Sequence, residues 1–338
     1  MSVANNRSTI KSALVTGGAG FIGSHLVEAL VATGCRVTVL DNLSTGHLEN
    51  LEACRQKITL IEGDIRDEKA LTRAARECEV VFHIAAEIFV QHTIENPVES
   101  AEINTIGTLN VLEAARQNRA RRVVLSSSCA VYGNPVHLPV TENDPAAPLS
   151  PYAVQKLTAE QYATIYSKLY GLEAVSLRYF NVYGPRQDSS SPYSGIISVF
   201  LNRAINVQKP IIHGDGEQSR DFIYVRDVVT ANLIAADQTG ISGEVFNIGT
   251  GQQITMNKLC LEVGSTAGVD LAPFYEPKRK GDVRASAADT NLAEKKLGFK
   301  AETNLTVGLA KTYQWYMKRL KAEVKPNKPE VRRQMPEP

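Results

Sequence analysis

Tyr152 and Lys156 form a pair of side chains that could carry out acid–base chemistry. Four positions apart, they lie on one face of the segment if it is helical. A free tyrosine has a pKa of about 10 and is a poor base at neutral pH. A neighbouring ammonium favours the phenolate and lowers that pKa, so the pair predicts a tyrosine that takes a proton from an alcohol. The ordinary alternative is a surface helix pair, because this spacing is common by chance.

A glycine-rich run follows a short β-rich segment and precedes a helical pattern. Its glycines allow a tight turn, close approach of the backbone to a pyrophosphate, and close packing of helix on strand. The helix N-terminus adds unpaired N–H groups and a positive dipole. The run therefore predicts a dinucleotide site that includes Gly17, Gly20, Phe21, Ile22 and Gly23.

Asp41 follows the second predicted strand, 18 residues beyond Gly23, where a carboxylate can accept both ribose hydroxyls of NAD. The same charge would repel the 2′-phosphate of NADP, so the sequence predicts NAD as the cofactor. Asp64 is placed to meet the adenine edge, while Ala85 and Ala86 leave room for the dinucleotide.

A bound nicotinamide would add its positive charge to that of Lys156 and further favour the Tyr152 phenolate. The phenolate could then remove a hydroxyl proton while the carbon's hydride moves to NAD. Ser128, near the end of the fifth predicted strand, would hold the same oxygen, and Lys156 would also bind the nicotinamide ribose.

Short, nearly all-apolar segments that alternate with helical patterns must position these residues. They predict an α/β protein with a Rossmann-like, doubly wound parallel sheet, whose ligand crevice lies at the carboxyl ends of the strands. The predicted strands are Ser12–Thr16, Arg36–Leu40, Ile58–Glu62, Val80–Ile84, Val123–Ser127 and Glu173–Arg178. The predicted helices are Ile22–Thr33, Asn104–Arg116 and Tyr152–Tyr170.

After Tyr179 the pattern loosens into segments rich in Gly, Pro, Ser and Asn, which we expect to be loops over a substrate site. A helix over 222–236 and a strand over 244–248 are expected to return to the main sheet. The prediction is an NAD-binding domain of 1–180 plus 222–250 and a smaller, discontinuous α/β lobe of 181–221 plus 251–320. Residues 321–338 are charged and proline-rich, and we expect them to be disordered.

Bulk properties exclude several classes of protein. The chain has 338 residues, 43% hydrophobic and 22% charged, with a net charge of +1, which favours neither nucleic acid nor a membrane as partner. No signal peptide or apolar run of membrane-spanning length is visible. Five cysteines without CxxC spacing and six histidines without ligand spacing predict no metal site, and a reducing cytoplasm fits best.

Taken together, the motifs resemble those of the extended short-chain dehydrogenases, specifically the nucleotide-sugar epimerase/dehydratase family. The resemblance runs from about Ser12 to Ala310 and includes TGGAGFIG, DNLSTG, GDIRD, HIAA, SSSCAVYG, SPYAVQK, RYFNVYGPRQ and GDGEQSRDFIYVRDV. It implies that Ser128, Tyr152 and Lys156 are catalytic. It also implies further cofactor contacts from Asn42, Ser44, Thr45, Gly46, Ile65, Asn104, Ser126 and Tyr179.

The residues after Ser128 bear on the reaction. Dehydratases of this family have Thr-Asp-Glu where this chain has Ser128-Cys129-Ala130, and related decarboxylases keep a glutamate at the Ala130 position. Without those carboxylates, the simplest chemistry is removal of a hydride from C4, rotation of the 4-keto sugar and return of the hydride to the other face. The resemblance thus implies a UDP-hexose 4-epimerase. Cys129 lies one position away from the cysteine that some relatives use, so we assign it no role.

Resemblance to the 4-epimerases also implies a substrate site. Asn181 would contact the diphosphate or sugar, Arg220 and Arg279 the phosphates, and Asp282 the uridine ribose, with Ser128 and Tyr152 at the reacting hydroxyl. Gln187 and Tyr193 are further candidates for the sugar pocket. Epimerases restricted to plain hexoses have a bulky Tyr four residues after the Asp282 position, where this chain has Ser286. We therefore expect the pocket to admit UDP-N-acetylglucosamine and UDP-N-acetylgalactosamine, UDP-glucose and UDP-galactose, or both pairs.

Three alternatives stay open. A UDP-glucuronate 4-epimerase would differ in the cations of the sugar pocket, and a net-oxidising dehydrogenase would consume added NAD. A non-catalytic NAD-binding scaffold is the alternative of a different class, and the intact Ser128, Tyr152 and Lys156 argue against it. A homodimer through the helices 104–116 and 152–170 is expected by analogy.

Overall fold

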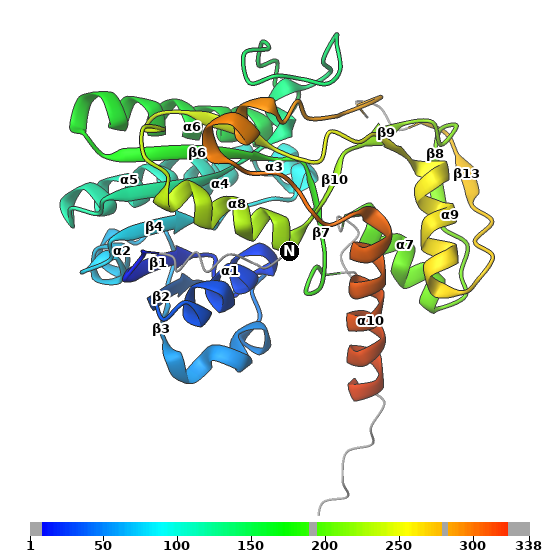
Figure 1. Ribbon diagram of the computed structural model, residues 1–338, viewed down its shortest axis with the longest axis horizontal. Helices are drawn as coiled ribbons and strands as arrows, with labels where there is room; N and C mark the ends of the chain where they lie inside the picture. Colours follow the sequence, from blue (N-terminus) through cyan, green and yellow to red (C-terminus); the bar gives the residue numbers. More distant parts are fainter. Residues whose placement is uncertain (1–8, 189–194, 279–282, 324–338) are drawn as a thin grey trace, which may run out of the picture.

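The computed structural model describes residues 9–188, 195–278 and 283–323. Its centre is a seven-stranded parallel sheet with the strand order β11-β6-β5-β4-β1-β2-β3 (Figure 1). The predicted doubly wound fold is confirmed, since chain order reverses beside β1. The strands are β1 (Ser12–Thr16), β2 (Arg36–Asp41), β3 (Ile58–Glu62), β4 (Val80–His83), β5 (Arg122–Ser128), β6 (Glu173–Tyr179) and β11 (Val245–Ile248).

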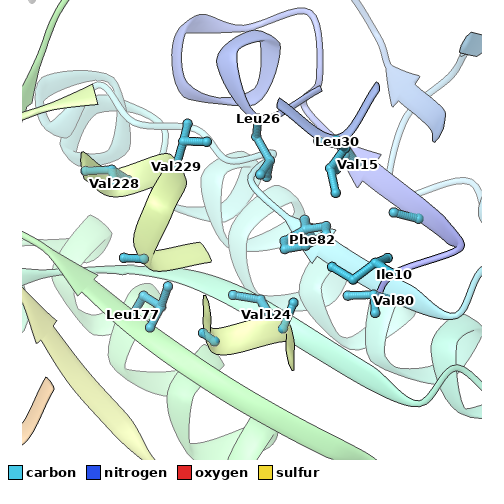
Figure 2. Packing of buried hydrophobic residues seen from close by; sticks show 14 of the residues in the cluster. Ile10, Val15, Leu26, Leu30, Val80, Phe82, Val124, Leu177, Val228 and Val229 are labelled. Atoms are coloured by element: carbon cyan, nitrogen blue, oxygen red, sulfur yellow. The ribbon is translucent and has the colours of Figure 1, made fainter. Parts of the chain in front are cut away.

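Both faces of the sheet are covered because its central strands are apolar on both sides. On one face, α1 (Phe21–Ala32) and α8 (Val225–Asp237) pack over β1, β4, β5 and β6 through Leu26, Leu30, Val228 and Val229 (Figure 2). On the other face lie α2 (Glu68–Ala75), α5 (Gly107–Gln117) and α6 (Pro151–Tyr170). Alternate residues of β1 enter the two clusters, which fixes the register of the sheet between its helical layers.

Local signals set both ends of α6. The Ser150 side chain accepts a hydrogen bond from the Ala153 N–H, and Pro151 occupies the first turn. Gly171 ends the helix in the left-handed conformation, with φ of 68°. Because the helix begins at this cap, Tyr152 lies in its first turn and Lys156 one turn later, at the carboxyl end of β5.

A second group of elements lies beside the sheet, at the right of Figure 1. Its helices are α7 (Ile196–Ile205), α9 (Met256–Ala267) and α10 (Leu305–Glu323), which surround a separate buried cluster that includes Phe200, Leu259 and Tyr316. Short strands accompany them: β7 (Asn181–Tyr183), β8 (Ile211–His213), β9 (Ser219–Arg220), β10 (Phe222–Tyr224), β12 (Ile254–Thr255) and β13 (Phe274–Glu276).

Several sequence predictions need correction. Residues 222–224 form β10, paired with β7, and not the start of a helix. Short strands also interrupt the predicted loops after Tyr179, because paired backbone satisfies buried polar groups there. The predicted disordered tail began at 321, but α10 continues to Glu323, and 324–338 lie outside the described residues.

The remaining elements connect these layers. They are η1 (Leu48–Lys57), α3 (Val90–Glu95), α4 (Pro97–Ala101), the π-turn η2 (Glu102–Ile106), η3 (Cys129–Tyr132) and η4 (Ala293–Leu297). Asn104 therefore lies in a short π-helix that precedes α5, where the sequence predicted a regular α-helix. Within the described ranges, no helix is both long and apolar enough to cross a membrane. The same residues contain no cluster of three or more His, Cys, Asp or Glu arranged for a metal ion.

Candidate active site

The glycine turn between β1 and α1 needs its glycines. Gly17 has φ of 68°, and a Cβ added there would lie 2.7 Å from the Ala85 backbone nitrogen. A Cβ at Gly23 would lie only 2.1 Å from the Gly17 carbonyl oxygen. The backbone of the turn thus lies so close to the segment after β4 and to its own helix that a side chain at either glycine would clash. This is the cradle that a pyrophosphate requires.

A pocket that is open to solvent lies at this turn. Its wall contains most of the residues predicted for the cofactor: Gly17, Gly20, Phe21, Ile22, Gly23, Asp41, Asn42, Ser44, Thr45, Asp64, Ile65, Ala85 and Ala86. Six further residues that were not predicted for the cofactor also line the pocket: Leu40, Gly63, Ile84, Glu87, Ile88 and Ile103. Gly63 and Ile84 lie within quoted motifs, and Leu40 and Glu87 directly adjoin them, which is the signal that could have found these four.

Asp41 organises the loop around the pocket. Its carboxylate accepts hydrogen bonds from the Ala19 N–H and the Leu43 N–H, both at 2.8 Å. A Cβ on Gly46 would lie 2.8 Å from the same carboxylate, so Gly46 packs against Asp41 and does not line the pocket itself. Burial raises the pKa of Asp41, and the two backbone donors oppose this rise. The fixed carboxylate suits a pair of ribose hydroxyls.

Asp64 is held by polar partners on two sides. The Arg66 guanidinium donates to both carboxylate oxygens at 2.9 Å, and the Asn42 amide donates to one of them at 2.9 Å. The Arg66 hydrogen bonds lower the pKa of Asp64 to about 2. The carboxylate is therefore ionised at neutral pH at the end of the pocket near Ser44 and Ile65.

The predicted catalytic residues come together at the end of β5. Lys156 Nζ donates to the Ser126 carbonyl oxygen at 3.0 Å and lies 5.9 Å from the centre of the Tyr152 ring. The Ser128 side chain lies close enough to the Tyr152 phenol to lower its pKa. A hydroxyl, a phenol and an ammonium therefore converge on one place, which is the arrangement that proton transfer to and from an alcohol needs.

Burial shifts the pKa values of both groups towards their neutral forms. It raises the pKa of Tyr152 to about 12, and the interaction with Ser128 only partly opposes this rise. Burial lowers the pKa of Lys156 to about 8, against the attraction of Glu160. The expectation that Lys156 and a bound nicotinamide together lower the pKa of the phenol remains a prediction.

Three further residues predicted for the cofactor do not line the pocket. Asn104 is buried, and its amide bonds to the Glu87 backbone and to Gln155. Ser126 is buried in β5 beside Lys156. Tyr179 ends β6 and donates its hydroxyl proton to Asn232 on α8. Their contact with the cofactor remains a prediction.

The predicted substrate residues come from separate strands that lie next to one another. Asn181 begins β7, which pairs with β10, and its N–H and amide both donate to the Asp221 carbonyl. Arg220 ends β9, and the Ser286 N–H donates to the carbonyl of Ser219 at 3.2 Å. Asn181, Arg220 and Ser286 are thus brought together. Arg279, Asp282 and Tyr193 lie outside the described residues.

Asp221 connects these segments, and the sequence analysis missed its role. Its buried carboxylate accepts from Thr250 N–H and Oγ1–H, from Gly251 N–H and from Ala288 N–H, at 2.6–3.1 Å. Its carbonyl holds Asn181. An acid directly after a predicted phosphate-binding arginine was the available signal, but its four donors come from parts of the chain that only folding brings close.

The positions that bear on the reaction contain no acid. Ser128 is followed by Cys129 and Ala130 in η3. Burial raises the pKa of the Cys129 thiol to about 12, so this side chain is a neutral neighbour of Tyr152. Gln187, a candidate for the sugar pocket, instead accepts from Ser198 and donates to the Val182 carbonyl.

A family model described as the NAD dependent epimerase/dehydratase family matches residues 13–249. The chain belongs to this family. It is 43% identical to a putative UDP-glucose 4-epimerase of Methanocaldococcus jannaschii over 304 aligned residues, and this alignment covers 89% of this chain and 97% of that protein.

This family member is also similar to solved structures. The UDP-glucose 4-epimerase of Thermotoga maritima with UDP-glucose has a TM-score of 0.87 at 40% identity and covers 91% and 99% of the two chains. The UDP-N-acetylglucosamine 4-epimerase of Methanobrevibacter ruminantium has a TM-score of 0.88 at 38% identity and covers 92% and 99%.

The family member is an NAD-dependent nucleotide-sugar 4-epimerase. The predictions of the family, the fold and the cofactor are confirmed. NAD fits the residues present, because the glycine turn offers bare backbone where a phosphate would lie and Asp41 offers a fixed carboxylate for ribose hydroxyls.

Proposed function

We propose that this epimerase interconverts UDP-N-acetylglucosamine and UDP-N-acetylgalactosamine, together with UDP-glucose and UDP-galactose, by transient oxidation at C4. The observation that carries the proposal is the convergence of Ser128, Tyr152 and Lys156 at the carboxyl end of β5, the edge of the sheet at which the dinucleotide pocket also lies, with no carboxylate at positions 129 and 130. NAD supplies the two-electron acceptor when bound.

The chain's own residues handle the proton and the sugar. Ser128 holds the sugar hydroxyl, and Tyr152 takes its proton and later returns it. Lys156, fixed by the Ser126 carbonyl, supplies positive charge near the phenol. Arg220 and Arg279 hold the diphosphate, with Asn181 and Asp282 at neighbouring parts of the substrate, so the sugar ring can turn while the nucleotide stays fixed.

The absence of an acid beside Ser128 supports epimerisation over elimination or decarboxylation. Loss of water across C5 and C6 needs a base and an acid beyond the phenol. Cys129 and Ala130 provide neither, because the Cys129 thiol stays protonated and alanine carries no polar atom. The 4-keto sugar therefore has one productive outcome, reduction back to an alcohol.

Ser286 supports acceptance of the acetylated pair. Its hydroxyl oxygen is buried and has no hydrogen-bond partner among the described residues. The Ser286 backbone pairs with Ser219 of β9, the residue that directly precedes Arg220. A small side chain with an unused polar atom leaves both space and a hydrogen-bonding group for an acetamido substituent.

Incubation of the pure protein with single UDP sugars, with the C4 configuration followed by NMR, tests the proposal. The panel contains both substrate pairs and UDP-glucuronate. Ser286→Tyr should abolish turnover of the acetylated pair and spare UDP-glucose, because the phenol fills the space for the acetyl group. Equal loss on both pairs, or no loss, contradicts the assignment of Ser286. Turnover of UDP-glucuronate alone contradicts the proposed substrates.

We also propose that the enzyme is a homodimer. The outer face of α6 exposes Val154, Ile165 and Leu169, whose spacing places them on one stripe opposite the buried face. Neighbouring Val98 and Ile106 are exposed as well. Exposed apolar side chains on neighbouring elements are typical of a subunit interface. Light scattering should give twice the chain mass, and a monomer at micromolar concentration would contradict the proposal.

A further inference from the structure

A network of buried, hydrogen-bonded polar side chains centres on His83, which is 2% exposed at the end of β4. It comprises Thr16, His83, Thr108 and Asn104. The Nδ1 of His83 lies 2.8 Å from the Thr16 hydroxyl, and its Nε2 lies 3.0 Å from the Thr108 hydroxyl. Neither threonine is needed for the apolar packing of the sheet. Three polar side chains from β1, β4 and α5 therefore meet in the interior.

The partners of the two hydroxyls determine where the imidazole proton lies. Thr108 donates its only hydroxyl proton to the Asn104 carbonyl at 2.6 Å, so its oxygen must accept from His83. The proton of a neutral imidazole is then on Nε2, and Nδ1 is left to accept. Thr16 supplies that proton, and its oxygen in turn accepts from the Ala85 N–H at 3.3 Å. Every donor in this hydrogen-bond network has one acceptor.

Each end of this hydrogen-bond network contacts a part of the cofactor pocket. Thr16 directly precedes Gly17 of the glycine turn, and Ala85 lines the pocket. At the other end, the Asn104 amide fixes the backbone of Glu87, which also lines the pocket, and bonds to Gln155. Gln155 adjoins Lys156 on α6. The imidazole thus links β1 to α5 and, through Asn104, to the backbone of Glu87 and to Gln155 on α6.

We propose that His83, neutral and protonated on Nε2, is a positioning residue that fixes the walls of the dinucleotide pocket relative to one another and so keeps NAD bound through the catalytic cycle. Burial, together with the charge of Lys156, lowers the pKa of His83 to about 3, so the neutral form dominates at every working pH. The proposal rests on NAD as cofactor and not on the identity of the sugar.

Replacement of Thr108 tests the link to the cofactor. Thr108→Val deletes the acceptor for Nε2–H and leaves a buried donor unpaired, whereas Thr108→Ser keeps the hydroxyl. We expect Thr108→Val to weaken NAD binding roughly tenfold and to release NADH during turnover, and Thr108→Ser to restore wild-type retention. Binding of NAD to the apoprotein is followed by calorimetry, which requires no sugar substrate.

Thr312→Val is the matched control. Thr312 is buried in α10 and donates to the carbonyl four residues earlier, as Thr108 does, but it lies in the cluster around α7, α9 and α10. It should lose similar thermal stability and keep the NAD affinity of the wild type. Equal loss of NAD affinity in both Val variants would overturn the proposal, because the effect would then be general destabilisation.

The tautomer is tested on the unmodified protein by ¹⁵N NMR of labelled histidine, so the outcome does not depend on a variant that folds. The expected spectrum has one imidazole with Nε2 protonated and Nδ1 bare, unchanged down to about pH 5. A proton on Nδ1, or titration of this imidazole near pH 6.5, would overturn the proposal. Because neither readout uses epimerisation, a failure here is distinct from a failure of the proposed substrates.

Discussion

The cofactor side and the sugar side of this active site are built in different ways. The dinucleotide pocket is lined by strand ends and the residues that directly follow them, such as Gly17 after β1, Asp41 at the end of β2 and Ala85 after β4. On the side predicted for the sugar, Asn181 and Arg220 lie on short strands and Ser286 follows an isolated β-bridge at Ala285. These residues are far apart in the sequence, and the Asp221 carboxylate and carbonyl tie their surroundings together.

The difference has a physical origin. In a parallel sheet all carboxyl ends meet at one edge, so consecutive motifs converge without further help. Segments that do not belong to the sheet need an explicit connector, and a buried carboxylate with four donors is a strong one. Damage to a cofactor-side residue and damage to the connector should therefore have separable effects on chemistry and on substrate affinity.

The largest effect is expected at the residue where the two sides meet. Tyr152→Phe removes the proton acceptor and should lower kcat by roughly a thousandfold, since acid–base groups contribute about 10²–10⁴-fold. NAD binding should remain, because the glycine turn and Asp41 are untouched. Steady-state kinetics and bound-NAD content measure both quantities, and activity near that of the wild type would remove the proposed role of the phenol.

An intermediate effect is expected at the connector. Asp221→Asn turns an N–H₂ group towards backbone donors, so at least one of the four hydrogen bonds is lost. KM for the UDP sugar should rise roughly tenfold or more with a smaller change in kcat, and NAD content should stay the same. Asp227→Asn is the control, since Asp227 is also buried and accepts from Glu302 and Thr303 backbone, away from Ser286. A matching rise in KM in both variants would remove the distinction between the two sides.

The smallest effect concerns stability against acid, to which two buried histidines of the cofactor side contribute. Burial lowers the pKa of His25, beside the Pro185 carbonyl, to about 4 and that of His83 to about 3, against 6.5 for a free imidazole. Between those values and pH 6.5 the unfolded chain binds more protons, so the free energy of unfolding falls as the pH drops through this window. His25→Gln should make this dependence shallower between pH 6.5 and 4, as measured by urea denaturation. An unchanged slope would show that His25 is not buried as a neutral base.

The sequence by itself predicted the sheet, the glycine turn, the cofactor and the place where Ser128, Tyr152 and Lys156 meet. Short apolar strands, capped helices and fixed spacings such as Tyr152 to Lys156 encode local structure, and β1 and β3 occur with the predicted bounds. The match of 13 pocket-lining residues follows from the same rule, because a motif at a strand end has only one edge to reach.

Only the tertiary structure decided the connections between distant segments and the protonation of buried groups. The four donors to Asp221 and the path from Thr16 through His83 to Thr108 join residues with no periodic relation in sequence. The rise in the pKa of Tyr152 was missed because spacing shows which charges are near, while the cost of desolvation depends on how completely the folded chain excludes water.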